Sequence, residues 1–260
     1  MTVSTIVFFH AHPDDESIAT GGSIARAAAE GHRACVVTAT GGEYGEAPEG
    51  VVGPDALREL RAEETHEACR ILGVSWGAFL GYTDSGMHGA ETNDAPGSFW
   101  SADVEEAAAK LAAILREQEA DALTIYDDHG GYGHPDHIQV HRVGKRAAEL
   151  AGTKAVFEAT HDRDYFQSLT SRYADAQVDA PGDEGFDLSE FGTPGADITT
   201  RIDVRSFLVQ KRAAMAAHRS QVGETSFFLA LPEELFGLTW GTEYYVGHPS
   251  DEPVPETWFF

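Results

Sequence analysis

Residues 6–16 read IVFFHAHPDDE, and this stretch decides both the fold and the chemistry that the chain predicts. The apolar run over 6–9 indicates a buried strand, and the charged cluster over 12–16 follows where that strand ends. A histidine, a stiff proline and three carboxylates at the mouth of a parallel sheet do little for stability. They can instead hold a metal ion beside a catalytic base. The cluster is therefore the first candidate for a functional site.

A second stretch downstream has the same order of features. The apolar run over 123–126, LTIY, leads into residues 127–137, DDHGGYGHPDH. Each stretch consists of a strand, a loop that contains His-Pro-Asp, and a helix. Because parallel strands end at the same edge of a sheet, we expect the two loops to meet in space.

Strand and helix patterns alternate over the first 160 residues, which predicts an α/β fold with a mostly parallel sheet and helices on both faces. The later chain predicts a surface loop, a strand, a helix and an irregular tail, all packed on the core of the same single domain over 1–260. The expected strands are 3–9, 33–38, 76–80, 122–126, 154–159 and 198–204, the expected helices are 17–30, 55–72, 102–118, 136–150 and 205–219, the loop is 175–197, and the tail begins at 227.

Composition excludes several classes of function. The chain has 260 residues, 42% of them hydrophobic, and a formal net charge of −25, so it should avoid nucleic acid and anionic membrane surfaces. Its two cysteines, Cys35 and Cys69, are too few for a disulfide framework, which fits a reducing compartment. We see no signal peptide and no stretch of about 18 apolar residues, and we expect a cytoplasmic protein that acts on a small molecule, with a homo-oligomer left open.

The residue types in the two loops suit a metal ion. His12 and Asp15 are three positions apart on one loop, and His137 can supply a third ligand from the other. Two imidazoles and a carboxylate with an open fourth position are typical of catalytic zinc, which lowers the pKa of bound water to about 7. Asp14 would then face that water as the general base. The same donors accept iron or cobalt, and an isolated Asp14 or Asp15 would instead be read as a helix cap.

Together the two loops resemble the PIG-L/LmbE-like zinc-dependent de-N-acetylases. The resemblance rests on residues 12–16, HPDDE, and 131–137, GYGHPDH, and covers spacing and strand order over about the first 160 residues. Residues 213–221, AAMAAHRSQ, are similar to a helix that occurs late in such proteins. The resemblance implies a Rossmann-like fold and one zinc per chain, with His12, Asp15 and His137 as its ligands.

The same resemblance implies roles for further residues. Asp14 matches the general base of the family, His134 matches a histidine that stabilises charge or protonates the leaving amine, and Tyr132 matches a donor to the tetrahedral oxyanion. Asp136 would orient and charge the imidazole of His134. The implied reaction is hydrolysis of the N-acetyl group of an N-acylated amino sugar or its conjugate.

Residues 84–87, DSGM, resemble the actinobacterial branch that acts on the mycothiol precursor and on mycothiol conjugates. In that branch the residues that match Asp84 and Arg61 contact sugar hydroxyls, and Glu43 is a further pocket candidate here. At one position where that branch carries Ser or Lys, this chain has Ala19. The competing interpretation of Arg61 is an ordinary ion pair on a helix surface with the glutamate three residues later.

Other functions stay open on the residues alone. One is an amidase for a larger amide such as a mycothiol S-conjugate, and another is a sugar-binding module that kept the fold. A third is a metal-dependent phosphoesterase with two ions about 3.5–4 Å apart. A dinucleotide site is excluded, because carboxylates follow the first strand instead of a Gly-x-Gly-x-x-Gly turn. Glu16 is expected only to cap the helix or support its neighbours. The two-ion site would use Asp14, Asp15, Asp127, Asp128 and His129.

Overall fold

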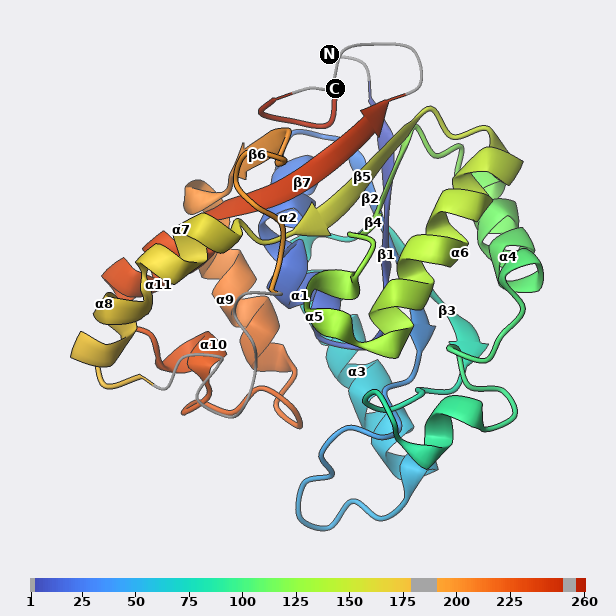
Figure 1. Ribbon diagram of the computed structural model, residues 1–260, viewed down its shortest axis with the longest axis horizontal. Coiled ribbons are helices and arrows are strands. Elements are labelled where there is room, and N and C mark those ends of the chain that lie inside the picture. Colours follow the sequence, from blue (N-terminus) through green and yellow to red (C-terminus); the bar gives the residue numbers. More distant parts are fainter. Residues whose placement is uncertain (1–2, 179–190, 250–255) are drawn as a thin grey trace.

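The computed structural model describes residues 3–178, 191–249 and 256–260, and it is built on one seven-stranded sheet (Figure 1). The strand order is β3-β2-β1-β4-β5-β7-β6. The first five strands in this order run parallel, and β7 is antiparallel to both β5 and β6. The strands are β1 Thr5–His10, β2 Arg33–Thr40, β3 Trp76–Tyr82, β4 Ala122–Tyr126, β5 Ala155–Thr160, β6 Thr200–Asp203 and β7 Thr242–Pro249.

Helices cover both faces of this sheet. The helices are α1 Asp15–Ala19, α2 Gly21–Ala29, α3 Pro54–Leu72, α4 Val104–Glu117, α5 Gly130–Gly133, α6 Pro135–Ala151, α7 Arg163–Ser168, α8 Thr170–Asp175, α9 Leu208–Ala217, α10 Phe227–Ala230 and α11 Glu233–Trp240, with 3-10 turns η1 Glu91–Asp94 and η2 Arg205–Phe207. Helices α4 and α6 pack on each other on one face, and α2, α3 and α9 pack together on the other (Figure 1). The predicted α/β architecture is confirmed.

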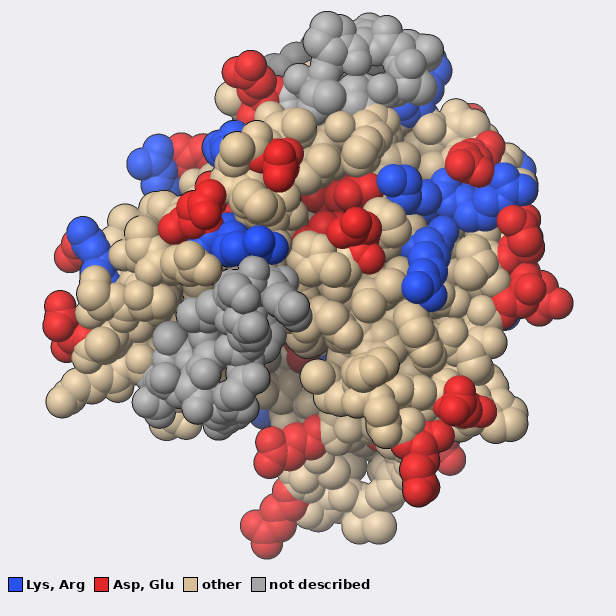
Figure 2. All heavy atoms as spheres, viewed as in Figure 1, with Lys and Arg blue, Asp and Glu red and all other residues tan. Residues whose placement is uncertain are grey.

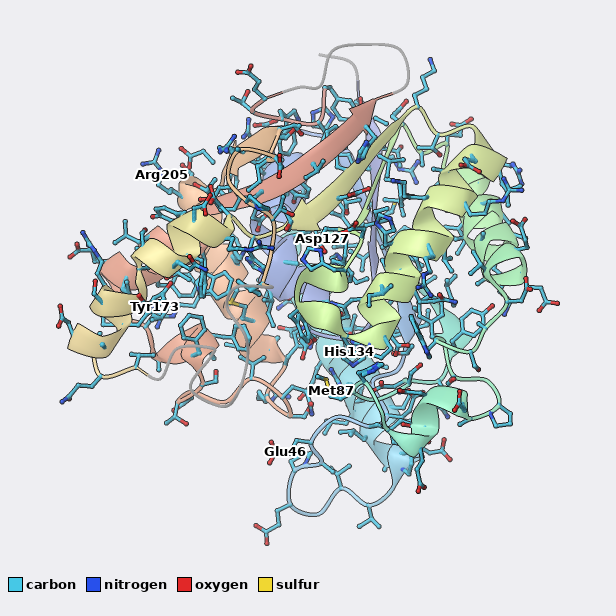
Figure 3. The ribbon with its side chains drawn as sticks, viewed as in Figure 1. Glu46, Met87, Asp127, His134, Tyr173 and Arg205 are labelled. Carbon is cyan, nitrogen blue, oxygen red and sulfur yellow. The ribbon has the colours of Figure 1, made fainter. Side chains whose placement is uncertain are left out.

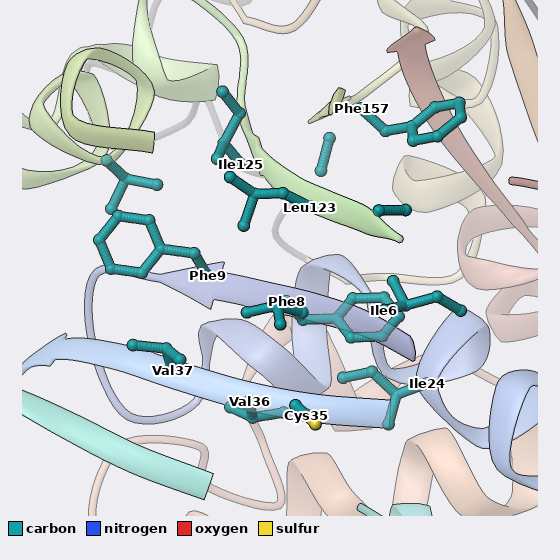
Figure 4. Close-up of a cluster of buried hydrophobic side chains, with 14 of the residues drawn as sticks. Ile6, Phe8, Phe9, Ile24, Cys35, Val36, Val37, Leu123, Ile125 and Phe157 are labelled. Atoms are coloured by element: carbon teal, nitrogen blue, oxygen red, sulfur yellow. The ribbon is translucent and has the colours of Figure 1, made fainter. Parts of the chain in front are cut away.

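Strand β1 lies inside the parallel part of the sheet, because β2 pairs with one of its edges and β4 with the other. All of its residues are buried. A strand buried on both faces needs apolar side chains on both, which explains the unbroken apolar run over 6–9. Figure 4 shows Phe8 and Phe9 of β1 among apolar side chains of β2 and β4. The charged cluster after β1 therefore begins at the carboxyl edge of a rigid core.

The predicted elements of the first 160 residues are confirmed to within a few residues, with one difference in the helix expected over 17–30. That helix is split into α1 and α2 at Thr20, whose φ is −133°. The Thr20 hydroxyl is 2.9 Å from His10 Nε2 and also donates to the Glu16 carbonyl. These contacts at the end of β1 replace helical geometry at Thr20 and break the helix.

The tail beyond residue 227 is more regular than expected. It forms α10, α11 and β7, and β7 extends the sheet beyond β5. Burial alternates along β7, a period of two that the sequence TEYYVGHP carried. The strand expected over 198–204 is shorter, as β6, and the helix expected over 205–219 begins with the η2 turn and ends at Ala217. The expected loop over 175–197 lies partly outside the described residues, and the single domain over 1–260 stays a prediction.

The charged surface follows the composition. Figure 2 shows Asp and Glu side chains in separate groups across this face, with Lys and Arg side chains among them. Within the described ranges, none of the helices is both long enough and apolar enough to cross a bilayer.

Candidate active site

The two charged loops meet, as the parallel strands predict. Strands β1 and β4 are paired neighbours, and the loops after them bring three imidazole rings together. The His12 ring centroid lies 4.6 Å from that of His134 and 5.3 Å from that of His137. Figure 3 shows His134 near the start of α6, with Met87 and Glu46 on loops at the same end of the sheet. The carboxyl edge of the sheet thus carries a compact cluster of imidazoles.

Asp14 has an unusual backbone conformation. Its φ is 97° and its ψ is −33°, in a region that residues other than glycine rarely adopt and that clusters at functional sites. Asp14 occupies the N-cap position of α1, yet its side chain makes no capping hydrogen bond. The helix-cap interpretation of Asp14 is therefore wrong, and the strained turn leaves its carboxylate directed elsewhere.

The three predicted metal ligands lie together. Asp15 Oδ2 is 3.5 Å from His12 Nδ1 and 3.5 Å from His137 Nε2, and it also accepts a hydrogen bond of 2.8 Å from the His12 amide. His137 Nε2 is buried, and no described residue forms a hydrogen bond with it. A buried imidazole nitrogen without a partner is costly unless an ion or water satisfies it. This donor set therefore fits a divalent metal ion.

Two further groupings of possible ligands overlap with this set. In the described ranges, the compact triads of metal-ligating side chains are His12 with His134 and His137, and His12 with Asp84 and Asp136. Both triads contain His12. A single locus centred on His12 is therefore indicated, with more donors around it than one ion needs.

The electrostatics of the locus suit a cation. Burial opposes charge on Asp15, but the imidazoles of His137 and His12 outweigh it and lower the pKa of that carboxyl. Burial lowers the pKa of His137 to about 4, so its imidazole is neutral at neutral pH. Burial also works against charge on His12, yet the carboxylates of Asp84 and Asp136 raise its pKa well above the ordinary value. Ionised carboxylate and neutral imidazole are the forms that bind metal, so Asp15 and His137 are ready to bind, whereas His12 must first release its proton.

Asp14 is placed beside a guanidinium. Its Oδ2 lies 3.3 Å from Arg61 Nη2. Burial raises the pKa of Asp14 to about 6, against the opposing effect of Arg61. A carboxyl group with a pKa close to the working pH is well suited to general-base catalysis.

His134 is neutral and has a defined tautomer. Burial, together with the nearby His12 and His137, lowers the pKa of His134 to about 2. The amide of Asp136 donates to His134 Nδ1 over 3.1 Å. Because Nδ1 accepts, the neutral ring carries its hydrogen on Nε2 and can donate one hydrogen bond from there.

The carboxylate of Asp136 is not on the His134 ring, where the resemblance placed it. It accepts hydrogen bonds from the Ser85 amide at 2.9 Å and the Ser85 hydroxyl at 2.5 Å, and it lies 3.1 Å from His12 Nε2. The hydrogen bond from Asp136 to His134 comes from its backbone amide. The reason is that the loop after β3 brings Ser85 against the first turn of α6, a contact that local sequence does not reveal.

Arg61 is not part of a surface ion pair. Its side chain is buried, and it donates to the Gly42 carbonyl at 2.8 Å and the Pro13 carbonyl at 2.5 Å. The competing interpretation, a pair with Glu64, is wrong, because Glu64 accepts hydrogen bonds from Ser220 instead. Arg61 therefore ties together the loops that follow β1 and β2.

Asp84 and Glu43 also organise loops at the site. Glu43 accepts from the Asp84 amide at 3.0 Å, and Asp84 accepts from the Tyr44 amide at 3.2 Å and the Gly86 amide at 2.8 Å. Asp84 Oδ1 is 3.5 Å from His12 Nε2. Both carboxylates lie in the locus, and their contact with a sugar stays a prediction.

Tyr132 lies at the rim. Its side chain is partly exposed, and its ring centroid is 5.0 Å from that of His137 and 6.1 Å from that of His134. The short helix α5 that carries it requires glycine. At Gly130, φ is 69° and an added Cβ would lie 2.6 Å from the Cβ of His137.

The two-ion site finds no support. Asp127 accepts from the Gly131 amide at 2.6 Å and the Thr160 hydroxyl at 2.6 Å, so it fastens the loop after β4. His129 Nδ1 is 3.0 Å from Asp128, which is largely exposed. Asp127, Asp128 and His129 join no compact ligand triad in the part of the chain that the structure describes. Asp15 joins none either, but unlike them it lies 3.5 Å from both His12 and His137.

Sequence reasoning missed two side chains near the site. The Ser85 hydroxyl donates a hydrogen bond to Asp136. The only signal of this contact in the sequence is the position of Ser85 shortly after β3. His218 reaches Glu16 at 2.6 Å from the far end of the chain. The only signal in the sequence that pointed to His218 was its place in the stretch over 213–221, to which no role could be assigned.

Comparisons with known proteins agree with this geometry. Residues 7–148 match the family described as PIG-L, GlcNAc-PI de-N-acetylase. A protein from Thermomonospora curvata named 1D-myo-inositol 2-acetamido-2-deoxy-alpha-D-glucopyranoside deacetylase is 43% identical over 92% of this chain and 89% of its own length. A protein of the same name from Acidothermus cellulolyticus is 40% identical over 94% of this chain and 88% of its own.

Among solved structures, the conserved protein TT1542 from Thermus thermophilus shares the fold, with a TM-score of 0.59 and 23% identity over 98% of each chain. The chain therefore belongs to the PIG-L family and is a metal-dependent N-deacetylase, a hydrolase of amide bonds.

Proposed function

We propose that this protein removes the acetyl group from an N-acetylglucosamine unit joined to inositol, the substrate class that its relatives from Thermomonospora and Acidothermus are named for. The observation that carries the proposal is the meeting of Asp14 and His134 with the His12, Asp15 and His137 cluster. A carboxylate base and a neutral imidazole donor beside a metal locus are groups that amide hydrolysis can use.

We propose that one zinc ion is held by His12, Asp15 and His137. The two 3.5 Å separations from Asp15 and the unpartnered His137 Nε2 support this set. When bound, zinc lowers the pKa of water and polarises a carbonyl. Iron and cobalt accept the same donors, so metal analysis of the native protein decides the ion.

Asp14 is the proposed base. Its carboxylate, held on one side by Arg61, takes a proton from water as the water oxygen forms its bond to the acetyl carbon. Negative charge then develops on the carbonyl oxygen, and the Nε2–H of His134 and the hydroxyl of Tyr132 donate to it. When the carbon–nitrogen bond breaks, the protonated Asp14 returns the proton to the departing amine. Acetate and the free amino sugar leave.

Asp84 is the proposed contact for a sugar hydroxyl, because its carboxylate borders the imidazole cluster. The proposed role of Arg61 is chiefly to hold the loops, since its guanidinium donates to two backbone carbonyls and to Asp14. We further propose that the protein works in the cytoplasm, which fits Cys35 and Cys69 as free thiols.

A panel of substrates tests the proposal. The purified, metal-loaded protein is given the N-acetylglucosaminyl inositol, free N-acetylglucosamine and a bulky mycothiol S-conjugate, and acetate and free amine are measured. We expect the highest kcat/KM for the inositol conjugate. Faster cleavage of the bulky amide would favour the amidase alternative and contradict the proposed substrate.

A further inference from the structure

The peptide bond between Pro13 and Asp14 is held at both of its polar groups. Arg61 Nη2 donates to the Pro13 carbonyl at 2.5 Å, and the Asp14 amide donates to Glu16 Oε2 at 3.1 Å. The same peptide precedes the strained φ of 97° at Asp14. A strained backbone persists only where its surroundings fix it, so these two contacts set the direction of the Asp14 side chain.

Glu16 is in turn held from the C-terminal part of the chain. His218, just after α9, donates from Nε2 to Glu16 Oε1 at 2.6 Å, and the Ser17 hydroxyl donates to the same oxygen at 2.6 Å. The side chains of Glu16 and His218 are fully buried. A glutamate that merely closes the first turn of a helix has no need of a buried partner 202 residues away.

The residues that follow His218 fix its position. Ser220 donates to Glu64 from its amide at 2.9 Å and from its hydroxyl at 2.7 Å. Gln221 donates to the Glu46 carbonyl at 2.7 Å. Helix α9 packs against both α1 and α3 (Figure 1). The stretch over 218–221 therefore joins the loops after β1 and β2 to α3, the helix that also carries Arg61.

We propose that Glu16 and His218 are positioning residues that hold Asp14 in its strained conformation, facing the metal locus. The inference rests on the proposed function, in which Asp14 is the base. Neither residue is among the metal ligands or substrate contacts proposed above. Loss of the His218 contact frees Glu16, the Asp14 amide loses its partner, and the base moves while the ligands stay.

The chain offers a matched control on the same helix. Lys211 Nζ lies 2.5 Å from Glu243 Oε1, and both side chains are buried. Glu243 also accepts from the amides of Gly22 and Ser23, so this pair joins α9 to α2 and β7, away from Asp14. If His218 only secured α9, then H218L and K211M would have the same effects.

The experiment compares wild type, H218L, H218Q and K211M by kcat, KM, metal content, melting temperature and amide exchange of the segment around Asp14. We expect H218L to lower kcat about 10–100-fold, as for a misplaced catalytic group, with KM and metal content within about twofold of wild type. Amide exchange at Asp14 should become faster. H218Q keeps an N–H donor and should recover most of kcat, whereas K211M should lower the melting temperature only.

A wild-type kcat in H218L, or unchanged exchange at Asp14, would overturn the inference. If H218L does not fold, E16Q repeats the test, because its amide group cannot accept from both His218 and the Asp14 amide. E16Q with wild-type kcat and exchange would overturn it equally. Absence of acetate release from the wild type would refute the proposed function instead, and the exchange comparison, which needs no substrate, would still test the positioning.

Discussion

Replacing Gly130 with alanine should weaken metal binding without touching a ligand. The added Cβ would lie 2.6 Å from the Cβ of His137 and 2.8 Å from the Ile138 amide nitrogen, closer than van der Waals contact allows. The backbone that carries His137 must shift, and its ring with it. Gly131 is the matched control, because its φ is 74° but an added Cβ meets no described residue within 4 Å.

Comparing the two variants separates the effect of backbone strain from the effect of displacing the His137 ligand. Alanine at a positive φ strains the backbone in both variants, at a cost of about 1–3 kcal/mol. In a chain of this size that lowers the melting temperature by about 2–12 °C. The G130A variant adds overpacking of about 1–3 kcal/mol. Displacing a ligand should also lower its metal affinity about 10–100-fold, the scale seen when the support of a ligand is lost.

The assay is a competition titration of zinc against a chelator of known affinity, with thermal unfolding in parallel. We expect G131A to keep wild-type affinity and G130A to lose it. Equal affinities in G130A, G131A and wild type would refute the assignment of His137 as a ligand held in place by the glycine turn.

Three further outcomes are expected. D14N should lower kcat about 10²–10⁴-fold, because an amide cannot take the proton from water. Its metal content should be unchanged, because Asn tolerates the positive φ at this position. A D14N variant with wild-type kcat would exclude Asp14 as the base. Chelation of the metal should lower the melting temperature, and zinc at about 100 times its Kd should restore about 2.7 kcal/mol; an unchanged unfolding curve would contradict a site formed only in the folded state. Burial lowers the pKa of His161 to about 4, below its value of 6.5 in the unfolded chain, so protonation favours unfolding as the pH falls through that window. The melting temperature of wild type should therefore fall more steeply from pH 6.5 to pH 4 than that of H161F, and parallel curves would contradict the shift.

Local patterns predicted the positions where backbone geometry places side chains. The parallel pairing of β1 and β4 follows from two apolar runs, and it brings the loops after them together whatever the rest of the chain does. His12, Asp15 and His137 could therefore be grouped from spacing and residue type. The alternation of buried and more exposed residues along β7 could also have been predicted from the sequence, but the irregular pattern on either side of it obscured the strand.

Side-chain contacts from segments other than these two loops could not be predicted. Asp136 is turned towards His12 because Ser85 arrives from the loop after β3, and nothing local to Asp136 encodes that contact. For Glu16 the expectation could go no further than a helix cap or support of its neighbours, because its partner, His218, lies 202 positions away. In both cases a buried polar group is satisfied by tertiary packing, which helix and strand periodicity does not report.

The central claim is that one metal ion and Asp14 together hydrolyse the acetamide. The most direct test is to titrate metal-free protein with zinc and measure acetate released from the N-acetylglucosaminyl inositol at each point. The account predicts that the rate rises in proportion to zinc and stops rising at one equivalent per chain. A plateau at two equivalents, or no acetate at any zinc content, would contradict it.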